Sequence, residues 1–128
     1  MKIKVFKLND RMFEEEIFIV VGDQTLADNW IKKRYKISAF GEKSFIDGCF
    51  ATYENKLRNE RHRIIWVRRF DWSVRTMGLL SHELLHCVHA VLKDIGFKFS
   101  DESEEIYTTY LQRLSTDAFW KMRNLRMK

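Results

Sequence analysis

Apolar and polar residues alternate along the first part of the chain as they do in β-strands. In residues 2–8, KIKVFKL, basic and apolar side chains take turns, which places one kind on each face of a pleated strand. Residues 16–21, EIFIVV, form a short β-branched and aromatic run that ends at Gly22-Asp23, as expected of a buried strand closed by a turn. Both segments are predicted to be strands.

The spacing of apolar residues becomes helical after this turn. Asp23 or Thr25 can cap a helix that continues to about Lys36, because both residue types accept hydrogen bonds from the free N–H groups of a first turn. A loose apolar stripe follows the same spacing, namely Leu26, Trp30 and Tyr35. The sequence therefore predicts a helix between the second strand and the middle of the chain.

Two more strands are predicted in the middle of the chain. Residues 44–53 and 63–70 are rich in aromatic and β-branched residues, which favour strands. The connection between them, NKLRNER, is strongly polar. We interpret the pair as two strands joined by an exposed turn.

An almost wholly apolar helix is predicted next. Asp71 or Ser73 can serve as its N-cap, and the helix runs through Leu92 and Ile95 to Gly96, a residue type common just past a helix end. The segment has few positions suited to face solvent, so it is predicted to be the central buried helix of the fold.

A last helix is predicted to begin near Ser100 or Ser103 and to continue towards the basic C-terminal residues. Four apolar residues recur there at helical spacing: Tyr107, Leu111, Leu114 and Ala118. The predicted strands and helices together make up an α+β fold.

Length and composition add the expectation of a single domain over residues 1–128. A chain of 128 residues with 45% hydrophobic content can enclose one core. It has no proline and five glycines, so no Pro/Gly-rich stretch serves as a linker between domains.

The N-terminal segment MKIKVFKLND carries charges between its apolar residues, which does not match the apolar stretch of a secretory signal. No segment has the uninterrupted apolar length of a membrane span. We therefore expect a soluble, cytoplasmic protein without a membrane partner. Cys49 and Cys87 form no CxxC pair and are expected to be free thiols.

The net charge of +5 changes this picture little. It arises from 23 basic and 18 acidic residues, and the basic residues gather at 32–34, 58–69 and 123–128. None of these groups coincides with a recognisable nucleic-acid-binding motif, so we interpret them as solvated surface. A nucleic-acid partner is not expected.

The motif His82-Glu83-Leu84-Leu85-His86 is where the sequence points to chemistry. Residues four apart lie on one helical face, so His82 and His86 can hold one metal ion. Glu83 lies beside that pair, where it can serve as a general base towards a metal-bound water. The pattern HExxH also arises by chance, but the flanking residues 79–88 carry no other charge. Burial of three polar side chains in such a helix is costly unless a metal satisfies them together.

A catalytic zinc site usually has three protein ligands, so a third donor is needed besides the two histidines. His89 lies on nearly the same face but one turn too far along to share the ion, so we interpret it as a core or supporting histidine. Glu104 and Glu105 are the better candidates. Helical phase relative to the apolar stripe favours Glu104.

HELLHCV, followed nineteen residues beyond His86 by Glu105-Ile-Tyr-Thr-Thr-Tyr-Leu, resembles the gluzincin metallopeptidases. It is also similar to small zincin-like proteins encoded by tailed phages. The resemblance covers about residues 64–115 and implies Zn²⁺ as cofactor, with His82, His86 and Glu105 as metal ligands. Thr109 stands where many gluzincins have an aspartate that orients a histidine ligand, so that support would have to be built differently.

The resemblance implies a zincin-like α+β fold, in which a small mixed sheet packs on the HExxH helix and a C-terminal helix closes the metal site. It also implies that the strand at 63–70 is an edge strand that pairs with an extended peptide substrate. A core strand is an equally good interpretation of those residues. Tyr107 and Tyr110 can serve as donors to an oxyanion, although aromatic residues at this spacing are more typical of a core.

The function expected from the motif and the resemblance is that of a zinc metallopeptidase, a hydrolase with Glu83 as its catalytic base and a peptide or protein as its substrate. The alternative is a non-catalytic zinc-binding protein of a phage particle or its assembly. A short chain favours the alternative, because little remains to build a substrate cleft. Retention of Glu83 favours the enzyme, because a structural zinc site needs no base.

Overall fold

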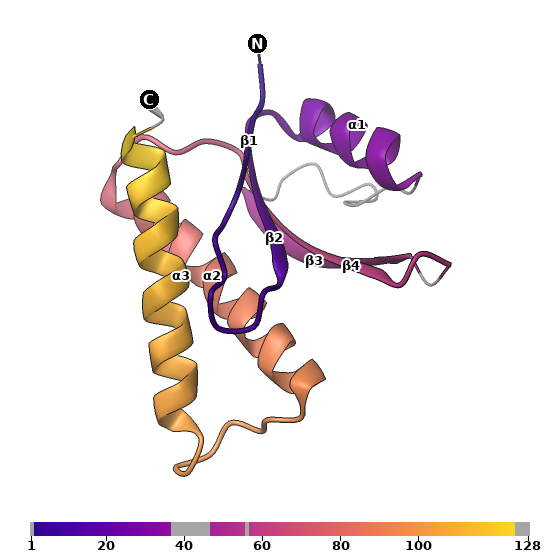
Figure 1. The fold of residues 1–128 in the computed structure, drawn as a ribbon. Helices are drawn as coiled ribbons and strands as arrows, with labels where there is room; N and C mark the ends of the chain where they lie inside the picture. Colours follow the sequence, from indigo (N-terminus) through magenta and orange to yellow (C-terminus); the bar gives the residue numbers. More distant parts are fainter. Residues whose placement is uncertain (1, 37–46, 56, 125–128) are drawn as a thin grey trace.

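Four strands and three helices make up the computed structural model, which describes residues 2–36, 47–55 and 57–124. Figure 1 shows the strands between α1 on one side and α2 and α3 on the other. In chain order the elements are β1 (Lys4–Lys7), β2 (Glu16–Val21), α1 (Gln24–Tyr35), β3 (Gly48–Asn55), β4 (Glu60–Val67), α2 (Val74–Ile95) and α3 (Glu104–Asn124).

The strands form one mixed sheet in the order β1-β2-β4-β3. β1 is antiparallel to β2 and β3 is antiparallel to β4, whereas β2 and β4 are parallel, with Ile19 opposite Ile65. The mixed α+β character predicted from the sequence is confirmed. Of the two interpretations of the strand at 63–70, the core strand is confirmed and the edge strand implied by the resemblance is wrong, because β4 lies between β2 and β3 and the described strands at the two edges are β1 and β3.

The strand boundaries differ from the predicted ones around the hairpin. β4 begins at Glu60 and ends at Val67, so Arg68, Arg69 and Phe70 leave the sheet although their sequence continues the strand pattern. β3 continues to Asn55, and the first residues of the predicted strand, 44–46, lie outside the described part of the chain. Part of the polar connection NKLRNER therefore belongs to the two strands.

Side chains from the two faces of the sheet enter two separate apolar clusters. Ile19 and Ile65 pack towards α2 and α3, whereas Val20 and Trp66 pack towards α1. Successive residues of a strand point to opposite faces, so strands covered on both sides need continuous apolar runs. This explains why the central strands β2 and β4 read as EIFIVV and RIIWV rather than as an alternating pattern.

Helix α1 begins where the sequence predicts. The Asp23 carboxylate accepts hydrogen bonds from the backbone N–H groups of Thr25 and Leu26, as an N-cap does. Its fully buried residues are Ala27 and Ile31. The predicted stripe of Leu26, Trp30 and Tyr35 is only half-buried, so the inward face of α1 is displaced by one residue from the prediction.

Helix α2 has the predicted ends but not the predicted surroundings. Ser73 caps its first turn, and Gly96, with a φ of 111°, ends it in a left-handed conformation that glycine adopts without strain. One face carries buried residues, whereas the opposite face is exposed and includes His82, Leu85 and His86. The prediction of a central helix buried all round is therefore wrong, since α2 covers one side of the sheet and leaves its own outer side open.

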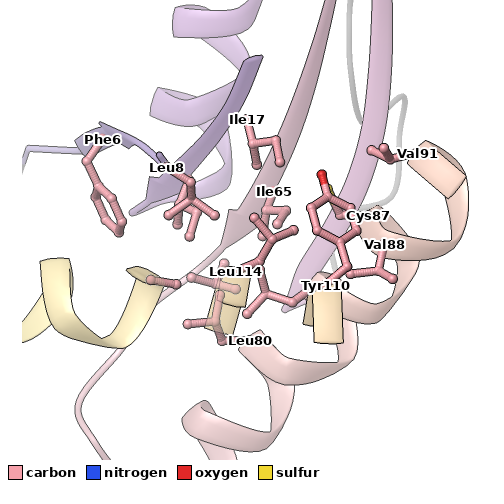
Figure 2. Packing of buried hydrophobic residues seen from close by; sticks show 14 of the residues in the cluster. Phe6, Leu8, Ile17, Ile65, Leu80, Cys87, Val88, Val91, Tyr110 and Leu114 are labelled. Atoms are coloured by element: carbon pink, nitrogen blue, oxygen red, sulfur yellow. The ribbon is translucent and has the colours of Figure 1, made fainter. Parts of the chain in front are cut away.

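Helix α3 packs against α2 and completes the larger apolar cluster. Figure 2 shows Leu80, Cys87, Val88 and Val91 of α2 and Tyr110 and Leu114 of α3 directed towards Ile17 and Ile65 of the sheet. Three of the four residues predicted to face inwards on α3 are buried, namely Tyr107, Leu114 and Ala118, and Leu111 is half-buried. Among the described residues, no helix is long and apolar enough to cross a membrane.

A buried arginine joins the sheet to the C-terminal end of α2. The Arg63 side chain is only 1% exposed, and its guanidinium donates to Glu15 at 2.9 Å, to Asp94 at 2.8 Å and to Thr52 at 2.9 Å. A buried charge is tolerated when it is paired and hydrogen-bonded in this way. Because Asp94 is on α2 and Arg63 is on β4, these bonds fix the helix against the sheet.

Candidate metal centre

His82 and His86 lie side by side on the exposed face of α2. Their Nε2 atoms are 3.2 Å apart and their ring centroids are 4.8 Å apart. The separation follows from the helix, since residues four apart are stacked about one turn from each other. Two imidazole nitrogens at this distance can share one proton or bind one cation between them.

The distance between the two nitrogens fits a metal ion. Nitrogens about 2.0–2.1 Å from a tetrahedral zinc ion are about 3.3 Å from each other. Glu83 adds a third donor, because one ligand atom from each of His82, Glu83 and His86 lies within 4.8 Å of the other two. Within the described residues, this is the one group of three or more histidine, cysteine or acidic side chains that can hold a metal ion.

Glu83 points to the inner side of the histidine pair. Its side chain is buried, with 4% of its surface exposed, and no hydrogen bond or ion pair joins it to another described residue. Burial raises the pKa of its carboxyl group above the usual value, and the nearby histidines counteract this in part. The raised pKa shows that the charged form of this carboxyl group is disfavoured, so the arrangement favours a ligand that supplies positive charge or a proton at this place.

Cys49 lies close to this carboxylate but is not one of the residues of the candidate group. Burial, followed by the negative charge of Glu83, raises the pKa of the Cys49 thiol to about 12. Cys49 and Cys87 are both free cysteines, as predicted. The proximity of Cys49 shows that Glu83 faces the beginning of β3.

The two histidines of the motif are exposed, contrary to the expectation from the sequence. The apolar flanks of the motif suggest that all three of its polar residues are buried, and the structure buries Glu83 alone. The energetic case for a metal therefore depends on the Glu83 carboxylate and on the geometry of the imidazole pair. The two imidazoles that would hold a cation are exposed, and the carboxylate beside them is buried.

The structure does not bring Glu105 to the histidines. Glu105 is exposed in the first turn of α3, accepts a hydrogen bond from Thr109 at 3.5 Å and lines a hollow together with Met12 and Phe97. Helical phase explains this position, because Glu105 and Thr109 lie four residues apart on one face of α3. The predicted closure of the metal site by α3 is not observed, since no residue of α3 belongs to the candidate group.

Glu104 lies on a different face of the same helix. It is three residues before Tyr107 and shares its face, and the Tyr107 ring lies 6.4 Å from the ring of His89 on α2. Glu104 is also outside the group of potential ligands. Of the two glutamates, it is the one that shares a face of α3 with Tyr107, which packs in the apolar cluster with α2.

Substitution of the two glutamates tests whether spacing from the motif or helical phase identifies the third metal ligand. We expect Glu104→Gln to weaken zinc binding about tenfold or more, if helical phase identifies the third ligand, and Glu105→Gln to leave the dissociation constant within about twofold of the parent. Competitive titration against a chromophoric chelator measures both. The opposite order would support the ligand implied by the resemblance and would require α3 to rearrange when the metal binds.

The remaining candidate residues of the sequence analysis have other surroundings. His89 is exposed and lies outside the ligand group, which contradicts its interpretation as a core histidine. The Tyr110 hydroxyl donates to the Asp10 carboxylate at 2.7 Å, and the Tyr107 hydroxyl to the Phe97 carbonyl at 3.4 Å. Both tyrosines are buried, so they are core residues rather than donors to an oxyanion.

A hollow of about 500 Å³ adjoins His82 and was missed by the sequence analysis. Its lining includes Arg68 and Arg69, which follow β4, together with Arg75 from the first turn of α2. The signal was present in the sequence as the basic group at 58–69, which we interpreted as solvated surface. A sequence does not show that residues after a strand and residues in the next helix converge on one hollow.

Comparison of the chain with models of protein families, with curated proteins and with solved structures gave no match.

Proposed function

We propose that the chain is a metal-dependent hydrolase of the zincin type that cleaves peptide bonds, with Zn²⁺ as its cofactor. One observation carries the proposal: two imidazole nitrogens 3.2 Å apart stand next to a buried carboxylate that has no partner among the described residues. A purely structural metal site consists of closed coordination and has no use for such a carboxylate.

The donor set suits zinc. Two neutral imidazoles are ligands that zinc accepts, and soft thiolate ligands are absent from the described group, in which Glu83 is the residue left to act on a water molecule. When bound, the ion acidifies a water molecule and polarises a carbonyl oxygen, which are the two contributions that peptide hydrolysis needs.

Glu83 is placed to move the proton. Its carboxylate lies on the inner side of the histidine pair and is within reach of the space next to both imidazoles. In the proposed reaction it accepts a proton from the attacking water and then donates it to the leaving amine. Burial raises the pKa of this carboxyl group, which makes it a better base than an exposed glutamate.

The edge strand β3 is suited to hold the substrate backbone. It is antiparallel to β4 and is an edge of the sheet among the described strands. Cys49, near its beginning, is close enough to Glu83 for the two to interact electrostatically. An extended peptide added to this edge would pass beside the metal ligands, which is how a sheet edge recognises peptide backbones.

The proposal is tested on the parent protein by two measurements. We expect metal analysis of protein purified without added zinc to give about one zinc per chain, and we expect cleavage of unfolded or extended peptides that stops when a chelator is added. Activity must return when zinc is restored. Protein without bound metal and without affinity for zinc would contradict the proposal as a whole.

A second candidate function is a non-catalytic metal-binding protein, for instance a component of a phage particle or its assembly. The observation that favours it is the exposure of the histidine pair on the outer face of α2, where the described residues form no enclosed cleft over it. Protein that carries a full complement of zinc but cleaves none of a varied set of peptides would select this candidate.

A further inference from the structure

The hollow beside His82 has a definite place in the fold. The end of β4 and the beginning of β3 meet there, since Val67 is paired with Gly48 and the Arg68 N–H donates to the Asp47 carbonyl at 2.8 Å. The first turns of α2 form the other wall. Its volume of about 500 Å³ lies in the range of ligand pockets, about 300–1,000 Å³.

The hollow carries an excess of positive charge. Three arginines, Arg68, Arg69 and Arg75, contribute to its lining against one carboxylate, Asp47. Asp47 is 3.5 Å from Arg68 and 3.4 Å from Arg75, so it lies between two guanidinium groups and neutralises one charge. A net charge of about +2 then remains in the hollow.

Arg75 and the two histidines belong to one continuous stripe of α2. Arg75, Gly78 and His82 recur at intervals of three and four residues, so they share a helical face, and His86 continues it. Arg75 and His82 are two turns apart, or about 10 Å along the helix axis. An extended peptide covers this length in about three residues.

Gly78 keeps the middle of this stripe open. A Cβ atom added to Gly78 would meet no other atom within 4 Å, so the space above the helix backbone there is empty. Glycine in a helix interior costs about 0.5–1 kcal/mol relative to alanine. The residue thus leaves a clear path between the arginines and His82.

We infer that the hollow binds a carboxylate of the substrate, about three residues from the bond that is cleaved. The inference rests on the proposed function for the position of that bond, and the carboxylate binding itself depends only on the arginines. Guanidinium groups bind carboxylates through paired, charge-assisted hydrogen bonds, which suits Arg69 and the 80% exposed Arg75 side chain. The substrate class is therefore a peptide with an acidic residue, or one whose C-terminal carboxylate occupies the hollow.

A peptide fits this hollow better than a nucleic acid. A protein that binds a nucleic-acid backbone has basic residues along an extended groove. A protein that binds nucleic-acid bases without reading their sequence stacks them on aromatic side chains. Here the basic groups surround one hollow of limited volume, and no aromatic side chain belongs to its described lining.

The test measures binding of capped peptides to metal-free protein by calorimetry. We expect a peptide with one glutamate to bind about tenfold more tightly than the same peptide with glutamine, and more weakly as salt is raised. Binding of an uncapped peptide without acidic side chains tests whether the hollow binds a C-terminal carboxylate. Binding of inorganic phosphate tests whether the hollow binds any oxyanion. Because no metal is present, the outcome does not depend on the proposed hydrolysis.

Variants identify the binding groups. Arg69→Gln and Arg75→Gln should each weaken binding of the glutamate peptide about tenfold. Gly78→Phe should weaken it by filling the hollow, and Gly78→Ala should weaken it less. Arg58→Gln is the matched control, because it removes the same charge from the turn at the far end of the β3–β4 hairpin.

Three results would overturn the inference. The first is equal affinity for the glutamate and glutamine peptides, and the second is an equal loss in Arg58→Gln and Arg75→Gln. The third is binding of phosphate or of a single-stranded oligonucleotide without binding of either carboxylate peptide. A preference for the capped glutamate peptide supports a side-chain carboxylate, and a preference for the uncapped peptide supports the chain terminus. Zinc titration of Arg75→Gln separately reports whether the metal centre is intact.

Discussion

Glu83→Gln is expected to bind zinc as the parent does and to lose hydrolytic activity by a factor of about 10² to 10⁴. The carboxylate lies beside the two imidazoles on the buried side of α2, so in the proposed reaction it serves the water rather than the ion. Glutamine keeps the shape of the side chain but cannot accept the proton. Metal titration and peptide cleavage, measured on the same preparation, separate the two effects.

The same variant should raise the free energy of unfolding of the metal-free protein at neutral pH. Burial raises the pKa of the Glu83 carboxyl group, so ionisation of Glu83 above that pKa destabilises the folded state. A neutral amide at this position removes the destabilisation. The gain should shrink as the pH falls towards the ordinary pKa of glutamate, because the carboxyl group is then protonated in both states. The control is Glu102→Gln, which replaces an exposed glutamate.

Full hydrolytic activity of Glu83→Gln would exclude Glu83 as the catalytic base.

His82→Ala and His86→Ala are each expected to lose most of the bound zinc. Each removes one of the two imidazoles whose Nε2 atoms are 3.2 Å apart, and the ligands that remain do not hold the ion against a chelator. His89→Ala is the matched control, since His89 is exposed on the same helix but lies outside the ligand group. Both variants should stay folded, because neither histidine is buried. Stoichiometric zinc in either of them would place the site elsewhere.

The elements of the fold were predictable where local signals determine them. β2 has the predicted limits, since its apolar run stops at Gly22, and α2 ends at the predicted Gly96 because glycine adopts the required left-handed conformation there. The pair His82 and His86 was predictable for the same reason, because their common face follows from helix geometry alone. Local signals of this kind do not depend on the rest of the chain.

Features that depend on packing were not predictable. Phe70 is buried and apolar, yet it lies beyond the end of β4, because it packs in the apolar cluster with α2 and α3 instead of extending the sheet. The open outer face of α2 is a second case, since an apolar composition does not reveal how many neighbours a helix has. The position of Glu105 is a third, because it depends on how α3 is rotated against α2.

The exposure of His82 and His86 has a consequence for the choice of metal. A buried site selects its ion through a rigid shell of fixed size, whereas an ion at the surface exchanges with the surrounding solution. Two imidazoles bind nickel and copper at least as well as zinc, so affinity alone does not favour zinc. The expected one zinc per chain therefore applies to growth media in which zinc is the most available of these ions, and media enriched in nickel or copper should give protein that carries those ions instead.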